Sequence, residues 1–294
     1  MIGGVDSSED LASHLRGWDP QPVDTTGTVE PWPAEAFAGL LDQPSPVKGT
    51  GDPLPPMWHW FHLLAHPGQS ALGDDGHPAR GAFLPPLPDR RRMFAGGRLQ
   101  VREPLRVGDE VARRSSLVTA TPKTGRSGSM VFVTERHEYR RAGMLALVEE
   151  QDYAYRSQPA GEARGLATEL QTAAEPGPVA PDAWRARLDP DSRMLFRFSA
   201  LTYNTHRIHY DHPYVTGVEG YPGLVVHGPL LALLLLELPR RFAPGRQVAG
   251  FSYRLRSPAF AGVPIVADGD ARGELTAGVP GQPPSVTGTV AFFG

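Results

Sequence analysis

The stretch from Phe198 to Leu238, FSALTYNTHRIHYDHPYVTGVEGYPGLVVHGPLLALLLLEL, decides how this chain is expected to fold. It ends in the nearly unbroken leucine run Leu230–Leu236. A helix that is apolar on every side is typically buried, so we expect a buried helix that begins at Gly228-Pro229. Its first turn would present backbone N–H groups and the positive end of the helix dipole to the space in front of it.

The same stretch holds four of the ten histidines of the chain. Asn204, His206, His209, Tyr210 and Asp211 fall within eight positions, and a Pro- and Gly-containing turn then leads to the helix start. Side chains that hold or move protons therefore precede a helix N-terminus by about twenty positions. This order is typical of a reaction site built beside a helix start.

Two motifs in this stretch carry a resemblance to a known family. They are SALTYNTHRIHYD (199–211) and VEGYPGLVVHGPL (218–230). Both resemble the MaoC-like, hydratase-2 type of hot-dog protein, in the branch of the mitochondrial 3-hydroxyacyl-thioester dehydratase type 2 and the mesaconyl- or itaconyl-CoA hydratases. A third block, HPARGAFLPPLPDRRRMFAGG (77–97), resembles the N-terminal half of that branch. The resemblance implies a hydro-lyase that hydrates an enoyl thioester or dehydrates a 3-hydroxyacyl thioester, linked to coenzyme A or to an acyl carrier protein.

Length and composition limit the classes of protein. With 294 residues, two units of about 150 residues are expected. The net charge of −3 gives no electrostatic footprint for nucleic acid. The absence of cysteine excludes disulfides, thiolate metal sites and a cysteine nucleophile. The N-terminal segment lacks the features of a secretory or mitochondrial signal, and the longest apolar run has seven residues against the roughly 20 that span a bilayer, so we expect a cytoplasmic protein with no membrane segment.

The region from Arg98 to Arg156 is rich in strand-forming residues. Turn chemistry divides it into four runs that we expect to form an antiparallel meander: Arg98–Glu103, Glu110–Ala120, Ser129–Tyr139 and Leu145–Tyr155. The segment from Ser157 to Ala183 is rich in Ala, Pro, Gly and Glu and has the composition of a linker, with a short helical turn expected at 166–173. We place the boundary there, which gives an N-terminal unit 1–170 and a C-terminal unit 171–294.

An internal repeat relates the two units. Arg102–Val111 and Arg256–Ile265 share the pattern Arg-x-Pro-x-x-x-Gly-x-x-aliphatic and lie 154 residues apart. Similar strand signals follow each copy. We therefore expect an α+β protein made of two tandem units, each an antiparallel sheet wrapped around a central helix. The resemblance supplies the name double hot dog for this arrangement.

The repeat also predicts where the chemistry lies. Positions 154 residues before His209 and Gly228 carry neither the histidine loop nor the His-Gly-Pro-Leu helix start. One active site per chain, in the C-terminal unit, is the expected result. The N-terminal unit would then supply a wall of the site and its specificity.

The residues in the C-terminal stretch suit acyl-thioester hydration. Histidine can take and give a proton near neutral pH, which makes His209 the candidate base. The helix start at Gly228 suits stabilisation of the thioester oxygen as it gains charge. In the hydratase-2 pattern Asp-x-Asn-Pro-aliphatic-His, Asn204 stands in place of the Asp and His206 in place of the Asn. Because an amide cannot transfer the proton, either His209 performs both transfers or His206 shares them, with Asn204 orienting water or substrate.

Further residues are assigned to substrate binding. Those that flank the loop and the helix start are Tyr210, Val226, His227 and Pro229. His227 fits packing or capping at the helix start better than chemistry. Arg92, within Arg90-Arg91-Arg92, is a candidate partner for a phosphate of the substrate's carrier, although solvated charge also explains such a cluster. Asp74, Asp75 and His77 are expected to form a turn and not a metal site, and no metal or cofactor is predicted.

Two other functions remain open at the level of sequence. The same scaffold hosts thioesterases, in which a carboxylate activates water, and non-catalytic acyl-thioester binders. A thioesterase would need an acidic residue early on the central helix, but the first one after Gly228 is Glu237, more than two turns later. The acyl group, the direction of the reaction and the formation of a homodimer are not decided by the sequence.

Overall fold

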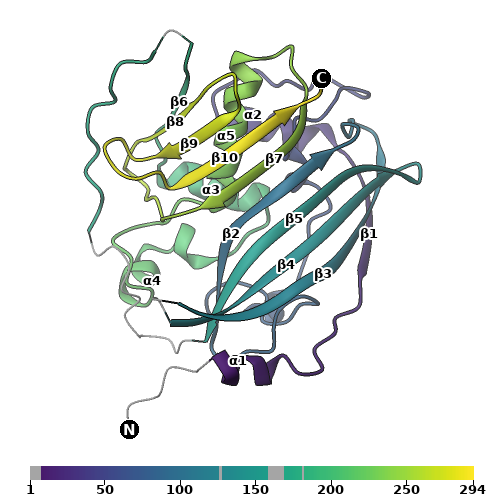
Figure 1. Ribbon diagram of the computed structural model, residues 1–294, viewed down its shortest axis with the longest axis vertical. Coiled ribbons are helices and arrows are strands. Elements are labelled where there is room, and N and C mark those ends of the chain that lie inside the picture. The colour runs from purple at the N-terminus through teal and green to yellow at the C-terminus, as the bar shows by residue number, and fades with distance from the viewer. Residues whose placement is uncertain (1–7, 126–127, 158–168, 181) are drawn as a thin grey trace.

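One continuous antiparallel sheet organises the molecule. The computed structural model describes residues 8–125, 128–157, 169–180 and 182–294. Its ten strands follow the order β1-β3-β4-β5-β2-β7-β10-β9-β8-β6 (Figure 1). Their bounds are β1 Val23–Thr28, β2 Arg90–Val101, β3 Glu110–Gly125, β4 Gly128–Arg141, β5 Met144–Ser157, β6 Trp184–Leu188, β7 Val248–Leu255, β8 Ile265–Gly269, β9 Glu274–Gly278 and β10 Val286–Phe292.

The sheet consists of two halves with the same strand order, related by the repeat found in the sequence. Strands β1 to β5 form one half and β6 to β10 the other, and the halves join where β2 pairs with β7, with Leu99 opposite Phe251. The first copy of the repeat, Arg102–Val111, connects β2 to β3, and the second, Arg256–Ile265, connects β7 to β8. The predicted α+β class with two tandem units is confirmed. The boundary at residues 170 and 171 falls between β5 and β6 and stays a prediction.

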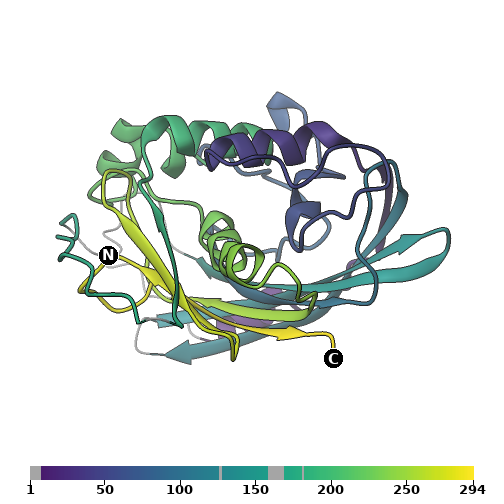
Figure 2. The same ribbon diagram turned by 90° about the horizontal axis from the view of Figure 1, so that it is seen from above.

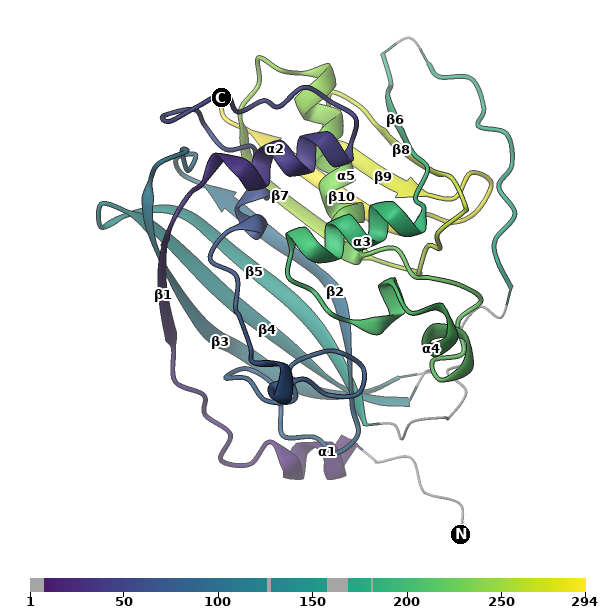
Figure 3. The same ribbon diagram turned by 180° about the vertical axis from the view of Figure 1, so that it is seen from behind.

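The leucine-rich helix lies inside the C-terminal half, as predicted. Helix α5, Gly228–Phe242, has every residue from Leu230 to Pro239 buried. Figure 2 shows it on the concave side of the sheet, with α2 (Pro31–Leu40) and α3 (Ser192–Leu201) on its far side. These two short helices lie next to each other, as Figure 3 shows from behind, and pack through Phe37 and Phe198, whose rings are 6.2 Å apart. Two further helices complete the described set: α1 Ser8–His14 and α4 His212–Gly217.

The N-terminal half differs from the expected unit because no long helix corresponds to α5. Between α2 and β2 the described residues form only two short 3-10 helices, η1 Trp58–Phe61 and η2 Gln69–Ala71. Five prolines between Gln43 and Met57 explain the difference, since each removes a backbone donor and clashes with the preceding helical turn. Trp58 and Phe61 are buried, fill part of this space and contact Phe37.

Two smaller expectations are corrected or left open. Strand β2 begins at Arg90, eight residues before the predicted start, and it pairs with β5 and β7, so only β3, β4 and β5 form a meander. Of the predicted helical turn at 166–173, residues 166–168 lie outside the described residues, and residues 169–173 are not helical. Within the described part of the chain, no helix is long and apolar enough to cross a membrane.

Candidate active site

The loop between α3 and α4 holds the predicted catalytic residues in a fixed shape. The Asn204 side-chain oxygen accepts a hydrogen bond of 3.0 Å from the backbone N–H of His206, which closes a tight Asx turn. Asp211 caps α4 by accepting from the backbone N–H of Tyr214 at 3.1 Å, and it also accepts from Arg207 Nε at 2.9 Å. In this structure Asn204 shapes the loop, and its orienting of water or substrate stays a prediction.

His209 has the protonation state that a base requires. Its ring is buried, and Nδ1 lies 2.7 Å from the carbonyl oxygen of Val225. A carbonyl oxygen only accepts, so Nδ1 carries the proton and Nε2 has a free lone pair. Burial lowers the pKa of His209 to about 4, although the bond to Val225 opposes this. The imidazole is therefore neutral at pH 7 and able to take a proton.

Three histidines of the C-terminal half are in ring contact. His227 stacks on His209 with ring centroids 3.6 Å apart, and His206 meets His209 edge to face at 5.4 Å. His227 is fully buried, and its Nε2 is 2.9 Å from Ser199 Oγ on α3. Burial lowers the pKa of His227 well below its usual value. These contacts support the packing role expected of His227, which holds the His209 ring against the start of α5.

The start of α5 is open enough to meet a ligand. Gly228 and Pro229 are partly exposed, whereas the residues that follow are buried. N–H groups in the first turn of a helix have no acceptor inside the helix. The N–H of Val226 is bonded to the carbonyl oxygen of Ala259 at 2.8 Å, so the donors for a thioester oxygen belong to the helix itself. A side chain at Gly228 would come within 2.4 Å of Leu255 and 3.3 Å of Phe94.

A loop of the N-terminal half docks against the catalytic loop. The backbone N–H of Arg207 donates to the carbonyl oxygen of Asp75 at 2.9 Å, and Thr205 Oγ1 donates to the carbonyl oxygen of Gly76. Gly76 has a φ of +87°, and a Cβ there would lie 1.8 Å from the carbonyl oxygen of Thr205. Only glycine permits this approach without a shift of the backbone. The N-terminal half thus contributes to the site itself, beyond the expected wall.

This docked loop brings Asp75 and His77 to the histidine cluster. The Nδ1 atom of His77 is 3.0 Å from a carboxylate oxygen of Asp75, and the His77 backbone N–H donates to the same side chain at 2.9 Å. The ring of His77 lies 3.9 Å from that of His206. Sequence analysis assigned Asp75 and His77 to a turn and missed this contact. Their place just before and at the start of the N-terminal block was the one available signal.

Asp75, His77 and His206 also merit consideration as a metal site, because their donor atoms lie within 4.8 Å of one another. The rings of His77 and His206 are in contact at an interplanar angle of 35°. In addition, Nδ1 of His77 is engaged by Asp75. Ring contact and hydrogen bonding account for the cluster, and we assign no metal to it.

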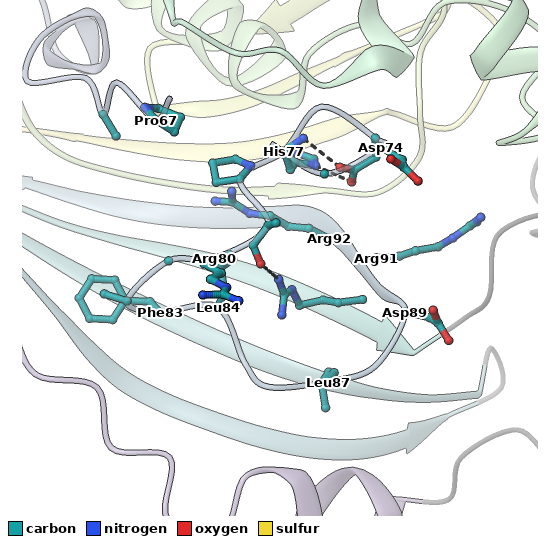
Figure 4. Close-up of a pocket in the computed structure, with 18 of the residues that line it drawn as sticks. Pro67, Asp74, His77, Arg80, Phe83, Leu84, Leu87, Asp89, Arg91 and Arg92 are labelled. Carbon is teal, nitrogen blue, oxygen red and sulfur yellow. Dashed lines mark hydrogen bonds and ion pairs between the residues drawn. The ribbon is translucent and has the colours of Figure 1, made fainter. Parts of the chain in front are cut away.

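A cavity of about 910 Å³ adjoins the docked loop. Its walls come mainly from residues 65–92, together with Glu135 on β4 and Tyr214 and Glu219 near α4. Figure 4 shows His77 beside Arg92, with Arg91 pointing away from Arg92. Of His77, His206 and His209, His77 alone lines this cavity.

Charged groups form part of the cavity lining. Arg92 lies with its guanidinium carbon 4.1 Å from the ring centre of Tyr153. Burial raises the pKa of Glu135 to about 7, although Arg92 and Arg113 oppose the shift. Arg91 Nη1 is 3.6 Å from a carboxylate oxygen of Glu219. At neutral pH Glu135 is therefore about half protonated and neutralises Arg92 only in part.

Three predicted substrate contacts lie outside the lining of this cavity. The Tyr210 side chain is 44% exposed, and its hydroxyl donates to the carbonyl oxygen of Thr205 at 3.0 Å. Val226 is buried, and Pro229 occupies the first turn of α5. Substrate binding by Tyr210, Val226 and Pro229 stays a prediction. Arg92 does line the cavity, but inside it and over Tyr153, which suits contact with the acyl group better than with an exposed phosphate.

Residues 57–261 match the protein family described as hydroxyacyl-thioester dehydratase type 2. The chain belongs to this family. A mesaconyl-C(4)-CoA hydratase of Chloroflexus aurantiacus is 48% identical over 227 residues, which cover 77% of this chain and 78% of the relative. A mitochondrial hydroxyacyl-thioester dehydratase type 2 of Schizosaccharomyces pombe is 28% identical over 72% of this chain and 76% of its own.

Solved structures confirm the double hot-dog fold. A MaoC-like dehydratase superposes with a TM-score of 0.66 at 15% identity, covering 94% of this chain and 99% of its own. A Mycobacterium tuberculosis protein described as having a double hot-dog fold gives a TM-score of 0.57 at 15% identity and covers all of both chains. At these identities the likeness concerns the fold alone.

Membership of the dehydratase family makes this protein an enzyme of the hydro-lyase type that acts on acyl thioesters, as predicted. The thioesterase alternative is not favoured. Glu237, the first acidic residue of α5, is buried and ion-paired with Arg240 and Arg241. Its carboxylate is therefore held at the far end of the helix from Gly228.

Proposed function

We propose that this enzyme catalyses the reversible hydration of an enoyl-CoA whose acyl group carries a second carboxylate, a substrate of the mesaconyl type. The observation that carries the proposal is the charged wall of the cavity, which Arg92 and Glu135 both line. The 48% identical relative, whose name specifies a mesaconyl-CoA substrate, supports the same substrate class. Cytoplasmic location and homodimer formation stay predictions of the sequence.

Arg92 is suited to recognise a carboxylate. A guanidinium group offers a planar fork of N–H donors that matches a carboxylate, and such charge-assisted bonds strengthen where water is excluded. Burial works against the charged form of Arg92, but Tyr153, Tyr155 and Glu135 raise its pKa, so the group stays cationic. A long hydrocarbon chain would have to strip water from this charge without compensation. A short acyl group ending in a carboxylate would instead pair with it.

The reacting end of the substrate would lie between the histidine cluster and the start of α5. In the dehydration direction, Nε2 of His209 takes the proton from the carbon next to the thioester. Negative charge then develops on the thioester oxygen. First-turn N–H groups of α5 and the helix dipole stabilise that charge without rearrangement, as oxyanion holes do.

A panel of substrates tests the proposal. The purified enzyme is mixed with mesaconyl-C(4)-CoA, crotonyl-CoA and oct-2-enoyl-CoA, and loss of the enoyl absorbance is followed with a thiol reagent present. We expect hydration without thiol release, with kcat/KM highest for the dicarboxylic substrate. A preference for octenoyl-CoA would reject the proposed substrate class, and release of free thiol would reject hydration.

The Arg92→Gln variant links the preference to the cavity. Loss of one charge-assisted hydrogen bond costs about 1.5–3 kcal/mol, which corresponds to roughly a 10- to 150-fold fall in kcat/KM for the dicarboxylic substrate. Crotonyl-CoA, which lacks the carboxylate, should be affected several-fold at most. Arg136→Gln is the matched control, since Arg136 lies on β4, which β5 separates from β2, and its side chain is 42% exposed. An equal loss for both substrates would contradict the assignment of Arg92.

A further inference from the structure

We propose that His77, held by Asp75, is the second proton-transferring group of the reaction and acts on the oxygen at C3 of the substrate. The N-terminal half would thereby supply the acid that the loop of the C-terminal half lacks. The inference rests on the hydratase activity proposed above, but not on the identity of the acyl group.

The catalytic loop lacks the acidic side chain that the hydratase-2 pattern has. Asn204 occupies the place of the acidic residue in the hydratase-2 pattern, and its side-chain oxygen is used by the backbone N–H of His206. His209 has one nitrogen committed to the carbonyl oxygen of Val225, which leaves a single site for proton transfer. Dehydration needs one group to remove the C2 proton and a donor for the C3 hydroxyl. Two groups perform these steps at the same time more readily than one.

The position of His77 suits contact with substrate. His77 lines the cavity, whereas His206 and His209 are buried behind it. Its ring centroid lies 3.9 Å from that of His206, and His206 meets His209 at 5.4 Å, so the three rings form a continuous row that begins at the cavity. A substrate that reaches His209 from the cavity would therefore pass alongside His77.

Asp75 sets the tautomer of His77. An ionised carboxylate can only accept, so Nδ1 of His77 carries the proton of their 3.0 Å bond. Nε2 is left as the nitrogen that exchanges a proton with the substrate. The bond to Asp75 also fixes the orientation of the His77 ring, as the carboxylate does for the histidine of a catalytic triad.

The proposed step is balanced without a further reactant. In dehydration the C2–H bond breaks, and its proton goes to Nε2 of His209 while the electron pair forms the C2–C3 double bond. The C3–O bond breaks as Nε2 of His77 gives its proton to the hydroxyl group, which departs as water. In hydration His77 takes a proton from the attacking water and His209 returns one to C2.

A substrate with a different leaving group separates this role from a structural one. Chloride leaves as an anion and needs no proton, so elimination from a 3-chloroacyl-CoA requires the base but not the acid. His77→Gln should lower kcat for dehydration of the 3-hydroxyacyl-CoA by roughly 10²- to 10⁴-fold, the range of a lost general acid. The same variant should eliminate chloride from the matching 3-chloro substrate within a few-fold of the wild-type rate. His209→Gln should lose both reactions.

Two further variants complete the experiment. Asp75→Asn should show the same selective loss to a smaller degree. If His77→Gln folds poorly, the comparison of the 3-hydroxy and 3-chloro substrates can be made with Asp75→Asn instead. His212→Gln is the control, because His212 is an exposed histidine at the start of α4, and it should match the wild type on both substrates. All variants are compared with the acyl group that the wild type dehydrates fastest, so failure of the dicarboxylate proposal leaves this test intact.

Two results would contradict the proposed role of His77. Wild-type dehydration by His77→Gln would show that this ring takes no part in proton transfer. An equal loss on the hydroxy and chloro substrates would assign His77 to support of the catalytic loop. Either result would overturn the proposal.

Discussion

At the scale of single residues, the protonation state of His209 leads to a prediction for the pH dependence of catalysis. Burial lowers the pKa of His209 to about 4, so this base stays unprotonated as the pH falls from 8 to about 5. In the dehydration direction, where the second histidine gives a proton and only His209 must be unprotonated, we expect no loss of kcat/KM near pH 6.5, where an ordinary histidine would gain its proton. His209→Gln should lower kcat by roughly 10²- to 10⁴-fold at every pH. Initial rates between pH 5 and 8, with circular dichroism to confirm folding, provide the measurement, and an acidic limb near 6.5 that disappears in His209→Gln would contradict it.

The residue scale also shows what the sequence could and could not predict. Asn204, His206 and His209 were found because they lie in one short motif. His77 was missed because its contact with His206 joins loops that are far apart in the chain, as the bond between Thr205 and Gly76 across 129 positions illustrates. Such a contact depends on how two separate loops fold against each other. No local pattern around His77 specifies it.

At the scale of secondary-structure elements, the start of α5 gives a prediction about Gly228. A valine side chain there would collide with Leu255, whose terminal carbon would lie 2.4 Å from the new Cβ, and it would block approach to the first-turn N–H groups. Gly228→Val should lower kcat by roughly 10²- to 10³-fold, the cost of a lost oxyanion donor. It should also lower Tm, because overpacking costs about 1–3 kcal/mol.

A companion variant separates these two effects. Adding Leu255→Ala removes the collision, so the double variant should recover much of the lost Tm while kcat stays low. Thermal unfolding and steady-state rates of both variants are the measurements. Recovery of kcat together with Tm would show that the helix start does not hold the thioester oxygen.

The elements were predicted to different degrees for physical reasons. Helix α5 was predicted because Leu230–Leu236 can be stable only where water is excluded from all sides. The missing central helix of the N-terminal half was not anticipated, although the prolines between Gln43 and Met57 were visible. The internal repeat suggested a helix in this half, but the prolines prevent one. The pairing of β2 with β5 and β7 could not be derived because sheet register depends on partners distant in sequence.

At the scale of the whole molecule, the internal repeat carried the most information. It predicted two units of similar length and one site per chain, and the sheet joins these units through β2 and β7. The loss of a central helix from one unit makes room for the cavity, whose walls come mainly from residues 65–92 in that same unit. Duplication followed by divergence of one copy would account for the proposed site, in which the C-terminal half supplies the base and the N-terminal half binds the acyl group.

Buried histidines make the stability of the whole molecule depend on pH. Burial lowers the pKa of His62, His137 and His209 to about 4, and it lowers that of His227 well below 6.5. Between pH 6.5 and 4 these side chains are neutral in the folded state and protonated in the unfolded chain. Unfolding therefore takes up protons, and the free energy of unfolding falls as the pH falls through this window.

Glu135 acts in the opposite direction. Burial raises its pKa to about 7, so between pH 7 and 4.5 the folded state holds a proton that the unfolded chain has released. Three protons gained by His62, His137 and His209 and one lost from Glu135 give a net uptake of about two near pH 5, or roughly 3 kcal/mol of stability lost per pH unit, and His227 acts in the same direction as the other histidines.

Urea unfolding at pH 7, 6 and 5 measures this dependence for the wild type and for Glu135→Gln. The amide removes the opposing proton, so the variant should lose stability more steeply on acidification, by about one further proton or 1.4 kcal/mol per pH unit. It should also be the more stable protein at pH 8, where the wild type must hold a buried carboxylate in its charged form. His14→Gln, which changes an exposed histidine at the end of α1, should follow the wild type. Equal slopes for the wild type and Glu135→Gln would show that Glu135 is already ionised in the folded protein. Glu135 would then neutralise the charge of Arg92, and the argument that this charge is only partly neutralised would fail.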